Sequence, residues 1–559
     1  MDYVICGAVV VLLFIAFFLK NAMDDKRKFF SVISDISASF GKKPTKVYDT
    51  NEMMYIQKFF ERHSTEDSID DITANDLDIE SVYKRMNYCR SSMGSEYLYY
   101  RLRTPVYDEN LLDKMEKKIS HFEKSKEDRV SLLTYYLKIG RMKGMSFYDC
   151  LDYFDSVPQK SLWWEYVSYV LIALFIGLIF IKPEVGIVGL ITILTINIVN
   201  YYSRRGSIEP YIISFGFMVN FINRAKEIQN ISCEAISDDL DTVKELTDKL
   251  KPLVRNSHIV TGKQVSAVGV GNPLDLFEDY GRMVFHMDII RFYKMLKIVK
   301  ENVDIIDSLY IKLGEIESYI SIAYFRASLT DGCCVPQNGD VITMKDGYHP
   351  LIENPVKNSI TAQRGVLITG SNASGKSTFL KTVALNVLCA STLHTCFAES
   401  FECPRIHLFS SMSLRDSLQN KDSYFMVEIK AIKRILDYTA AYPDKKVLCF
   451  VDEVLRGTNT VERIAAGCEI LRGFSGKNVQ CFAATHDGEL TILLEDVYDN
   501  YHFEEDIKEN DVLFSYKIEK GRATSRNAIK LLAVMGYDDS IVNNAVNLAG
   551  RFVETGEWK

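Results

Sequence analysis

The chain has 559 residues, of which 47% are hydrophobic, 12% aromatic and 25% charged, and its formal net charge is −8. This length predicts two to four domains, and the composition excludes a largely disordered chain. The acidic balance provides no overall basic field, so a nucleic acid would have to bind a local patch or an enclosing shape. The twelve cysteines include no C-x-x-C pair, which predicts reduced, packed thiols rather than a disulfide framework or a metal site.

The chain opens with an apolar run, Tyr3 to Leu19, that carries no charge and is followed by Lys20 and a basic cluster at 26–28. Its length is barely enough to span a bilayer as a helix. A cleaved signal peptide is the alternative, but no basic residue precedes the run and no A-x-A-like site follows it, which favours an uncleaved anchor. The basic flank predicts that the residues after it are cytoplasmic.

Two further apolar runs, residues 166–181 and 185–202, are separated by only three residues. Each could instead be a helix buried in a protein core. Their adjacency, with aromatic and basic residues at their outer ends, favours a transmembrane hairpin with a positive cytoplasmic flank. The flanking residues are Trp163, Trp164, Tyr201, Tyr202, Arg204 and Arg205.

Most of the remaining chain before residue 331 is helical in pattern. Residues 284–326 carry apolar side chains at three- and four-residue spacing without proline, which predicts one long helix or two nearly collinear ones. Such a helix could be a rigid lever or a bundle member, and the spacing alone does not choose between them.

After Gly332, short apolar runs alternate with helical patterns, as is typical of an α/β domain. The predicted strands are Gly365–Thr369, Lys446–Val451, Gln480–Ala484 and Val512–Ile518.

A glycine-rich turn follows the first predicted strand. It reads GSNASGKS from Gly370 to Ser377 and fits G-x-x-x-x-G-K-[ST], with an apolar strand before it and an apolar helix after it. Glycines let successive backbone N–H groups and the positive end of the helix point at phosphate oxygens. We expect Lys376 to reach the outer phosphates of ATP and the Ser377 hydroxyl to bind Mg²⁺. The predicted nucleotide-binding residues are Gly370, Ser371, Asn372, Ala373, Ser374, Gly375, Lys376, Ser377 and Thr378.

Two later strands end in polar residues. The segment VLCFVDEVLRGTNT at 447–460 delivers Asp452 and Glu453 where the ligands of open α/β sheets collect. We expect Asp452 in the Mg²⁺ shell and Glu453 to orient or deprotonate the water that attacks the γ-phosphate. In CFAATHDGEL, His486 ends a third strand, where a neutral imidazole could position the γ-phosphate. A plain strand edge and a structural histidine are the alternatives.

Together these motifs resemble the ATPase of the DNA mismatch-repair family MutS, a branch of the ABC-type nucleotide-binding proteins. The resemblance is carried by the order and spacing of TGSNASGKSTFLK, DSYFMVEIKAIKRIL, DEVLRGTNTVERIAAG and ATHDGELT. It continues more weakly upstream, where residues 73–105 are similar to the opening of the family's helical core and residues 314–326 to the end of its lever helices.

The resemblance implies that ATP binds at a homodimer interface, where Ser423 of one subunit reaches the γ-phosphate held by the other. Ser423 could equally cap the helix that follows it, and the two roles are compatible. The resemblance also implies that Asn372 contacts nucleotide, that residues 456–458 couple the two sites, and that the tail after residue 520 dimerises.

The predicted domains follow from these assignments. They are an N-terminal transmembrane anchor (1–22), a helical linker (23–74), the first part of a MutS-like helical core (75–160), a transmembrane hairpin (161–205), the second part of the core with its lever (206–330), a MutS-like ATPase domain (331–520) and a helical dimerisation tail (521–559).

The chain departs from the family in two places. Too few residues separate the first apolar run from the helical core to form the family's mismatch-reading domain. Where the family inserts a DNA-gripping clamp, this chain has the apolar hairpin, which leaves at most a reduced clamp around 235–280.

We therefore predict an α/β P-loop NTPase of the ABC/MutS type, joined to an all-α core and to transmembrane helices, in the cell membrane with its catalytic part cytoplasmic. It is expected to hydrolyse ATP with Mg²⁺ and, by family resemblance, to couple hydrolysis to DNA. The alternative is an ATP-driven membrane machine or scaffold without nucleic-acid binding. Transport is disfavoured because the chain offers only three spans and no LSGGQ-like signature.

Overall fold

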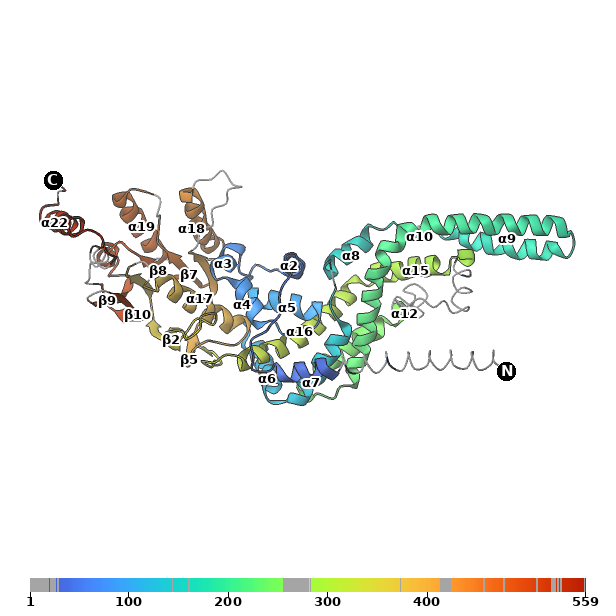
Figure 1. Ribbon diagram of the computed structural model, residues 1–559, viewed down its shortest axis with the longest axis horizontal. Helices are drawn as coiled ribbons and strands as arrows, with labels where there is room; N and C mark the ends of the chain where they lie inside the picture. The colour runs from blue at the N-terminus through green and yellow to red at the C-terminus, as the bar shows by residue number, and fades with distance from the viewer. Residues whose placement is uncertain are drawn as a thin grey trace, which may run out of the picture.

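The computed structural model describes Lys20, Arg27 and residues 30–558, except 143, 159–160, 255–280, 282, 372–373, 413–423, 456–457, 476–477, 509–510, 524–528, 530–531, 533–534 and 557. The predicted anchor at Tyr3–Leu19, and most of the segment proposed as a reduced clamp, lie outside the described residues. The molecule is elongated, with an α/β domain at one end, a helical body in the middle and an α-hairpin projecting from the other end (Figure 1).

The helical body is built from short helices before and after the hairpin. Many of them begin at a side chain that satisfies the first free N–H groups: Asp70, Ser91, Asp108 and Ser125 each accept a hydrogen bond from the first turn that follows. The body comprises α2 (Glu52–His63), α3 (Asp71–Asp76), α4 (Ile79–Met86), α5 (Ser92–Arg103), α6 (Glu109–Lys124), α7 (Lys126–Ile139), α8 (Phe147–Ser156), η1 (Ile228–Asn230), η2 (Glu234–Ile236), α11 (Ser237–Lys249), α12 (Lys251–Val254), α15 (Met287–Glu301) and α16 (Val303–Ala327).

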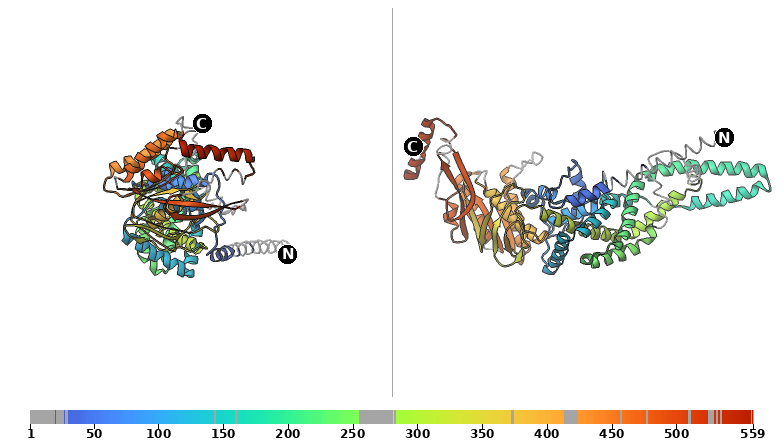
Figure 2. Two further views of the ribbon diagram at one scale, coloured as in Figure 1. Left: turned by 90° about the vertical axis from the view of Figure 1, so that its left-hand side faces the viewer. Right: turned by 60° about the horizontal axis from the view of Figure 1, so that its bottom comes forward.

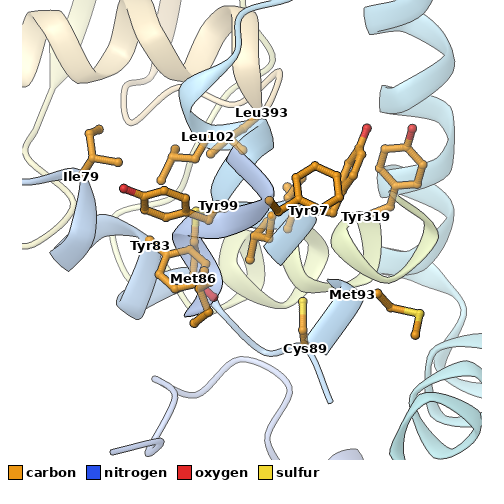
Figure 3. Close-up of a cluster of buried hydrophobic side chains, with 14 of the residues drawn as sticks. Ile79, Tyr83, Met86, Cys89, Met93, Tyr97, Tyr99, Leu102, Tyr319 and Leu393 are labelled. Carbon is orange, nitrogen blue, oxygen red and sulfur yellow. The ribbon is translucent and has the colours of Figure 1, made fainter. Parts of the chain in front are cut away.

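The centre of the body is the contact between α5 and α16. Gly314 makes this contact close, because a Cβ there would lie 2.6 Å from the Met93 carbonyl oxygen. Figure 3 shows a buried cluster of the body, in which Tyr83 and Met86 from α4 lie near Tyr99 from α5, and Tyr97 from α5 lies on the side of Tyr319 from α16. Aromatic rings of this kind contribute both apolar area and edge-to-face contacts.

The long helical pattern at 284–326 forms two helices, α15 and α16, which meet at Asn302. The prediction of one long helix or two is therefore confirmed in its second form. Asn302, at φ −131°, is not helical and separates the two helices. His286, at φ +48°, has a left-handed backbone conformation, so α15 begins only after it.

The predicted hairpin is present as two helices, α9 (Trp163–Ile179) and α10 (Pro183–Glu227). Helix α10 has 45 residues, so it continues through residue 205, where the sequence predicts a domain boundary, and its second half joins the helical body (Figure 2). By length and composition one described helical segment, Pro183–Gly206, could cross a membrane, with a mean hydropathy of 1.7, and α9 is a shorter apolar helix.

Most of the apolar surface of the hairpin is exposed. Only 22% of the most apolar window of Pro183–Gly206 is buried inside the protein, so the alternative of a buried core helix is wrong for this segment. Strongly exposed apolar side chains of the hairpin include Val170, Phe180, Ile181, Val188, Ile191 and Val199.

A ring of paired charges lies at the base of the hairpin. Arg204 on α10 pairs with the fully buried Glu165 on α9, and Arg205 pairs with the buried Asp288 on α15. Tyr201 also donates to Asp288, at 3.0 Å. Because each buried carboxylate is paired, the ring attaches the hairpin to α15 without leaving an isolated buried charge.

The α/β domain contains two sheets. The larger has the strand order β10-β9-β4-β8-β7-β6, in which every neighbouring pair is parallel except the antiparallel pair β9–β10. Its strands are β4 (Gly365–Thr369), β6 (His407–Ser411), β7 (Val447–Asp452), β8 (Val479–Thr485), β9 (Tyr498–Lys508) and β10 (Asp511–Lys520). The four predicted strands correspond to β4, β7, β8 and β10, so these predictions are confirmed. The smaller sheet has the order β1-β5-β2-β3, with β1 (Gln337–Asn338), β2 (Ile342–Gly347), β3 (Asn358–Ala362) and β5 (Ser400–Cys403).

Helices cover both faces of the larger sheet. Alternate residues of β4 belong to different apolar clusters: Val366 and Ile368 pack in the cluster that contains α17, whereas Leu367 packs in the cluster that contains α18 and α19. This two-sided burial is why the strands are almost continuously apolar in sequence. The helices of the domain are α17 (Lys376–Thr392), α18 (Tyr424–Ala441), α19 (Thr460–Ser475), α20 (Leu490–Leu493) and, beyond the sheet, α22 (Asp539–Thr555).

The body and the α/β domain share one continuous core. Arg326 at the end of α16 donates to Thr395 Oγ1 and to the His394 carbonyl, both at 2.7 Å, and forms a two-pronged pair with Glu116 on α6. Burial alone would raise the pKa of Glu116. Its hydrogen bonds to Arg326 and His394 outweigh this effect and lower the pKa from 4.5 to about 2. The end of α16 is therefore fixed against the segment that follows α17.

The described cysteines are free thiols and most are buried, as the sequence predicts.

Candidate functional site

The turn between β4 and α17 depends on two glycines with positive φ. Gly370 has φ +149° and Gly375 has φ +105°, values that side chains other than glycine rarely adopt. A Cβ on Gly370 would also lie 2.9 Å from Ser374 Oγ and 3.2 Å from the Phe503 carbonyl oxygen. The turn can therefore wrap closely around a ligand and lead directly into the N-terminus of α17. Asn372 and Ala373, within the same turn, lie outside the described residues.

Lys376 folds back over this turn. Its Nζ donates to the carbonyl oxygens of Gly370 and Ser371, both at 2.8 Å, and lies 3.5 Å from His486 Nε2. The side chain is 5% exposed. An ammonium group held here is a fixed positive charge facing the space that the turn encloses.

Ser377 and Asp452 are brought together by the sheet. Strand β7 lies two places from β4 in the sheet, so its carboxyl end comes next to the start of α17. The Ser377 hydroxyl donates to Asp452 Oδ2 at 2.5 Å. A hydroxyl and a carboxylate oxygen are donors that Mg²⁺ prefers, so the pair fits this ion chemically.

Glu453 and His486 form the second pair of the site. His486 Nε2 lies 2.6 Å from Glu453 Oε1, and both side chains are partly exposed. Glu453 has φ +61°, and its backbone N–H donates to the Ala484 carbonyl at 2.9 Å. A non-glycine residue in this region is strained, and such strain is common where a side chain is held for a function.

Two supporting interactions of this pair could not be foreseen from the motifs. The buried carboxylate of Glu428 on α18 accepts a hydrogen bond from the backbone N–H of Leu455, at 2.5 Å, and so fixes the loop that follows β7. Arg463 on α19 donates to both carboxylate oxygens of Asp487, at 2.9 and 2.6 Å, directly beside His486. Glu428 lies inside the quoted motif DSYFMVEIK, which was the only sequence signal for it.

Lys376, Ser377, Asp452 and Glu453 line a cavity of about 690 Å³, whereas His486 lines a smaller cavity that Glu453 also borders. The lining of the larger cavity also includes the apolar side chains of Ile352, Pro355 and Val356. His349 lies in the same cavity, where burial, with a contribution from Lys381, lowers the pKa of its imidazole to about 4. A cavity of this size with both polar and apolar lining residues suits a small ligand that has a charged and an apolar part.

The structure thus brings together the polar residues that the sequence singles out at the strand ends and in the glycine turn. Ser423, Arg456 and Gly457 lie outside the described residues, and Thr458 donates to Glu462 at 3.2 Å. The predicted roles of all these residues stay predictions.

Comparison with known proteins finds relatives of the part of the chain that carries this arrangement. Residues 366–553 match MutS domain V. Human "MutS protein homolog 4" is 32% identical over 286 residues, which cover 47% of this chain and 30% of that protein. "DNA mismatch repair protein MutS" of Fusobacterium nucleatum is 29% identical over 256 residues, and that of Thermus thermophilus is 27% identical over 238 residues. These matches cover 43% and 42% of this chain, and 28% and 29% of the two proteins.

The matched part spans less than a third of each of these relatives and about half of this chain or less. It includes the glycine turn and the Asp452–Glu453 strand end, which line the cavity, and His486, which contacts Glu453. Over the α/β domain that carries this site, the chain is therefore similar to MutS proteins, and residues 366–553 match their domain V.

Proposed function

We propose that the chain is an ATPase of the P-loop type, with Mg²⁺ as its cofactor, and that its reaction centre is the turn Gly370–Ser377 together with Asp452, Glu453 and His486. The observation that carries this proposal is the convergence of two hydrogen-bonded pairs, Ser377–Asp452 and Glu453–His486, at one glycine turn. Domain V of the MutS family, to which the turn belongs, is an ATPase domain and supports the assignment.

Each group has a distinct role in this proposal. The phosphates of ATP replace the carbonyl oxygens that Lys376 now contacts, since a phosphate oxygen is the stronger partner for an ammonium group. Ser377 and Asp452 hold Mg²⁺, which neutralises charge that develops on the phosphates. Glu453 orients and deprotonates the attacking water, and His486 keeps the Glu453 carboxylate directed at it. The apolar wall at Ile352, Pro355 and Val356 takes the base of the nucleotide.

Two copies of the chain close over the nucleotide in this proposal, with Ser423 of one subunit reaching the γ-phosphate held by the other. The C-terminal helix α22 supports a dimer because it exposes an apolar row that includes Ile541, Leu548 and Phe552. Such a row on a surface helix is usually covered by another helix.

The test of the reaction centre is the variant Glu453→Gln. The amide keeps the shape of the side chain but cannot take a proton, so hydrolysis should fall by roughly 10²–10⁴-fold while ATP binding persists. Binding is measured with a fluorescent ATP analogue and hydrolysis by phosphate release, and Glu469→Gln on the exposed face of α19 is the matched control. An undiminished rate in Glu453→Gln would exclude Glu453 as the base, and absence of ATP binding in the unaltered chain would exclude the whole proposal.

The second part of the proposal concerns where the ATPase is located and what it acts on. We propose that the chain is a multi-pass protein of the cell membrane, with the helical body and the α/β domain cytoplasmic. The exposed apolar surface of the α9–α10 hairpin supports this location, as do Arg204 and Arg205 at the end expected to face the cytoplasm. We further propose DNA as the effector, because the relatives that share the site include DNA mismatch repair proteins.

The exposed hairpin also favours a second candidate, an ATP-driven membrane machine or scaffold that binds no nucleic acid. Fluorescence-anisotropy titrations with homoduplex, mismatched and branched DNA, at several salt concentrations and with or without ATP, separate the two. Binding that weakens with salt and responds to ATP supports the DNA-linked function. Its absence from chain that hydrolyses ATP supports the second candidate.

A further inference from the structure

Three side chains with metal-binding atoms meet in the helical body, and none of them lines the cavity at the glycine turn. His121 lies in the last turn of α6, Asp128 in the first turn of α7, and Cys233 directly before η2. His121 Nε2 lies 2.7 Å from Asp128 Oδ2 and 3.7 Å from Cys233 Sγ. The three atoms all lie within 4.8 Å of one another.

The short joint between α6 and α7 holds two of these groups in place. Ser125 is both the C-cap of α6 and the N-cap of α7. Its hydroxyl donates to Asp128 Oδ2 at 2.8 Å. The Asp128 carboxylate is thereby turned toward His121, which lies on the opposite side of the joint. The two side chains are preorganised by local structure rather than by a flexible surface contact.

Cys233 completes the group from another part of the chain. It is buried, with 5% of its surface exposed, and carries a free thiol. A divalent cation bound between the thiol and the Asp128 carboxylate would favour the thiolate form of Cys233.

The spacing of the three atoms suits zinc. Zinc bonds of about 2.3 Å to sulfur and 2.0–2.2 Å to nitrogen and oxygen place neighbouring ligands of a tetrahedron roughly 3.3–3.6 Å apart. The observed sulfur–nitrogen distance of 3.7 Å is close to this range. The nitrogen–oxygen distance of 2.7 Å is that of a hydrogen bond and needs to open by about 0.6 Å. The side chains of His121 and Asp128 are 31% and 22% exposed, so a cation can enter from solvent.

Other histidine–carboxylate groups in the described part of the chain lack this combination. His63 pairs with Asp307 at 3.0 Å, but its ring is stacked on Phe59 and belongs to no such three-residue group among the described residues. His502 meets Glu504 and Glu519, two exposed carboxylates, without sulfur. A buried thiolate beside an imidazole and a carboxylate is the set that favours a borderline-soft ion such as Zn²⁺ over Mg²⁺ or Ca²⁺.

We propose that His121, Asp128 and Cys233 form a zinc site, with water as the fourth ligand. Cys233 follows the end of α10 at Glu227 by only a few residues, and α10 carries the hairpin. Zinc at this position ties the segment after α10 to the α6–α7 joint and so stabilises the base of the hairpin-bearing helix. The ATP site and its chemistry are not required for this ion to bind.

The test is metal binding by the full chain, purified in mild detergent and stripped with a chelator. Zinc is titrated in competition with a chromogenic chelator, and cobalt serves as a spectroscopic substitute. We expect one tight zinc ion per chain, proton release on binding, and a thiolate-to-cobalt charge-transfer band. The substitution Cys233→Ser should abolish that band and weaken zinc binding by roughly 10–100-fold or more, since loss of even an outer-shell partner costs this much.

Two matched variants separate this site from general thiol or histidine effects. Cys150→Ser removes another buried thiol, and His63→Gln breaks another histidine–aspartate pair. Both should bind zinc and cobalt as the unaltered chain does, and all the variants should keep the circular-dichroism spectrum of the folded protein. Equal zinc affinity of Cys233→Ser and the unaltered chain, or a cobalt complex without the charge-transfer band, overturns the proposal.

Discussion

The hydroxyl of Ser377 and the carboxylate of Asp452 lie 2.5 Å apart. Two ligands of one octahedral Mg²⁺ ion, with bonds of 2.0–2.1 Å, lie about 2.9 Å apart. The two oxygens therefore need to move only a few tenths of an ångström to become ligands of a single ion. Ser377 can therefore be tested as a Mg²⁺ ligand without changing Asp452 or Glu453.

The variant Ser377→Ala should raise the Mg²⁺ concentration needed for half-maximal ATP hydrolysis about tenfold or more, because one oxygen ligand is lost. Phosphate release is measured over a range of Mg²⁺ at saturating ATP. Ser475→Ala, at the exposed end of α19, is the control and should leave the Mg²⁺ curve unchanged. Coincident curves for Ser377→Ala and the unaltered chain would show that Ser377 is not a ligand.

Glu317 on α16 is a fully buried carboxyl group. It accepts hydrogen bonds from the Ser91 hydroxyl and from the backbone N–H groups of Arg90 and Ser91. Burial raises its pKa from 4.5 to about 7, and these hydrogen bonds only partly oppose that rise. The folded protein therefore binds this proton more tightly than the unfolded chain does.

The contribution of Glu317 to stability is fully present below about pH 4.5 and is lost as the pH rises to 7, a loss of about 3 kcal/mol. Glu317→Gln keeps a neutral side chain at every pH, so it should melt at a higher temperature than the unaltered chain at pH 8 and show little difference at pH 5. Melting temperatures are compared by differential scanning fluorimetry, with Glu80→Gln, on the exposed face of α4, as the control. Parallel pH curves for Glu317→Gln and the unaltered chain would contradict this assignment.

At the scale of elements, α16 packs tightly against α5 at Gly314. A Cβ at this position would lie 2.6 Å from the Met93 carbonyl oxygen and 2.9 Å from Tyr97 Cβ. Neither the backbone atom nor the root of the tyrosine side chain can move without shifting a helix.

Gly314→Ala should therefore destabilise the protein by about 1–3 kcal/mol, as overpacking does elsewhere. Gly473 on α19 is the matched case, because a Cβ there meets nothing within 4 Å. Gly473→Ala should stabilise by up to about 1 kcal/mol through helix propensity alone. Thermal unfolding of both variants measures the contrast, and a shift of the same sign in both would show that the α5–α16 contact is not tight.

The elements differ in how far the sequence predicts them. Strands β4, β7 and β8 are buried on both faces, so each is a continuous apolar run that is visible in sequence. Strands β2 and β3 alternate buried and exposed positions and carry polar residues, and no motif marks them, so they were not predicted. The continuation of α10 beyond residue 202 was also missed, because its composition changes there while its helix does not.

The candidate site also has contacts that the sequence predicts and contacts that it does not. Ser377 and Asp452 could be predicted to meet, since each belongs to a motif whose spacing implies its place at a strand end. The Glu428–Leu455 and Arg463–Asp487 contacts could not, because they depend on how α18 and α19 lie on the sheet. Interactions between elements that are distant in sequence are set by the assembled fold and leave no local pattern.

At the scale of the whole molecule, the hairpin is the part whose surface differs most from the rest. Val188 and Ile191 are 65% and 60% exposed on α10, in the middle of the run that could cross a membrane. Val461 on α19 is 75% exposed but lies in the α/β domain at the other end of the molecule (Figure 1). Substitutions at Val188, Ile191 and Val461 therefore test whether the hairpin surface faces lipid, as proposed, or is exposed like a single apolar side chain elsewhere.

Val188→Lys and Ile191→Lys should each weaken binding of the full chain to liposomes by roughly a hundredfold, because a lysine at the centre of a membrane helix costs about 2.5–3.5 kcal/mol. Co-flotation with neutral liposomes measures the bound fraction. Val461→Lys should float like the unaltered chain. If all three variants float equally, the hairpin does not enter the lipid.

The hydrogen bonds of Arg326 make the stability of the α/β domain depend on the helical body that precedes it. Leu393 and the segment after it lie in the same core as α5 and α16, and Arg326 ties that segment to Glu116. A fragment expressed from Gly332 onward would expose this apolar face to water and lose the partner of the His394 carbonyl. Nucleotide-domain fragments of this protein should therefore aggregate, whereas fragments that retain the preceding helices should stay monodisperse.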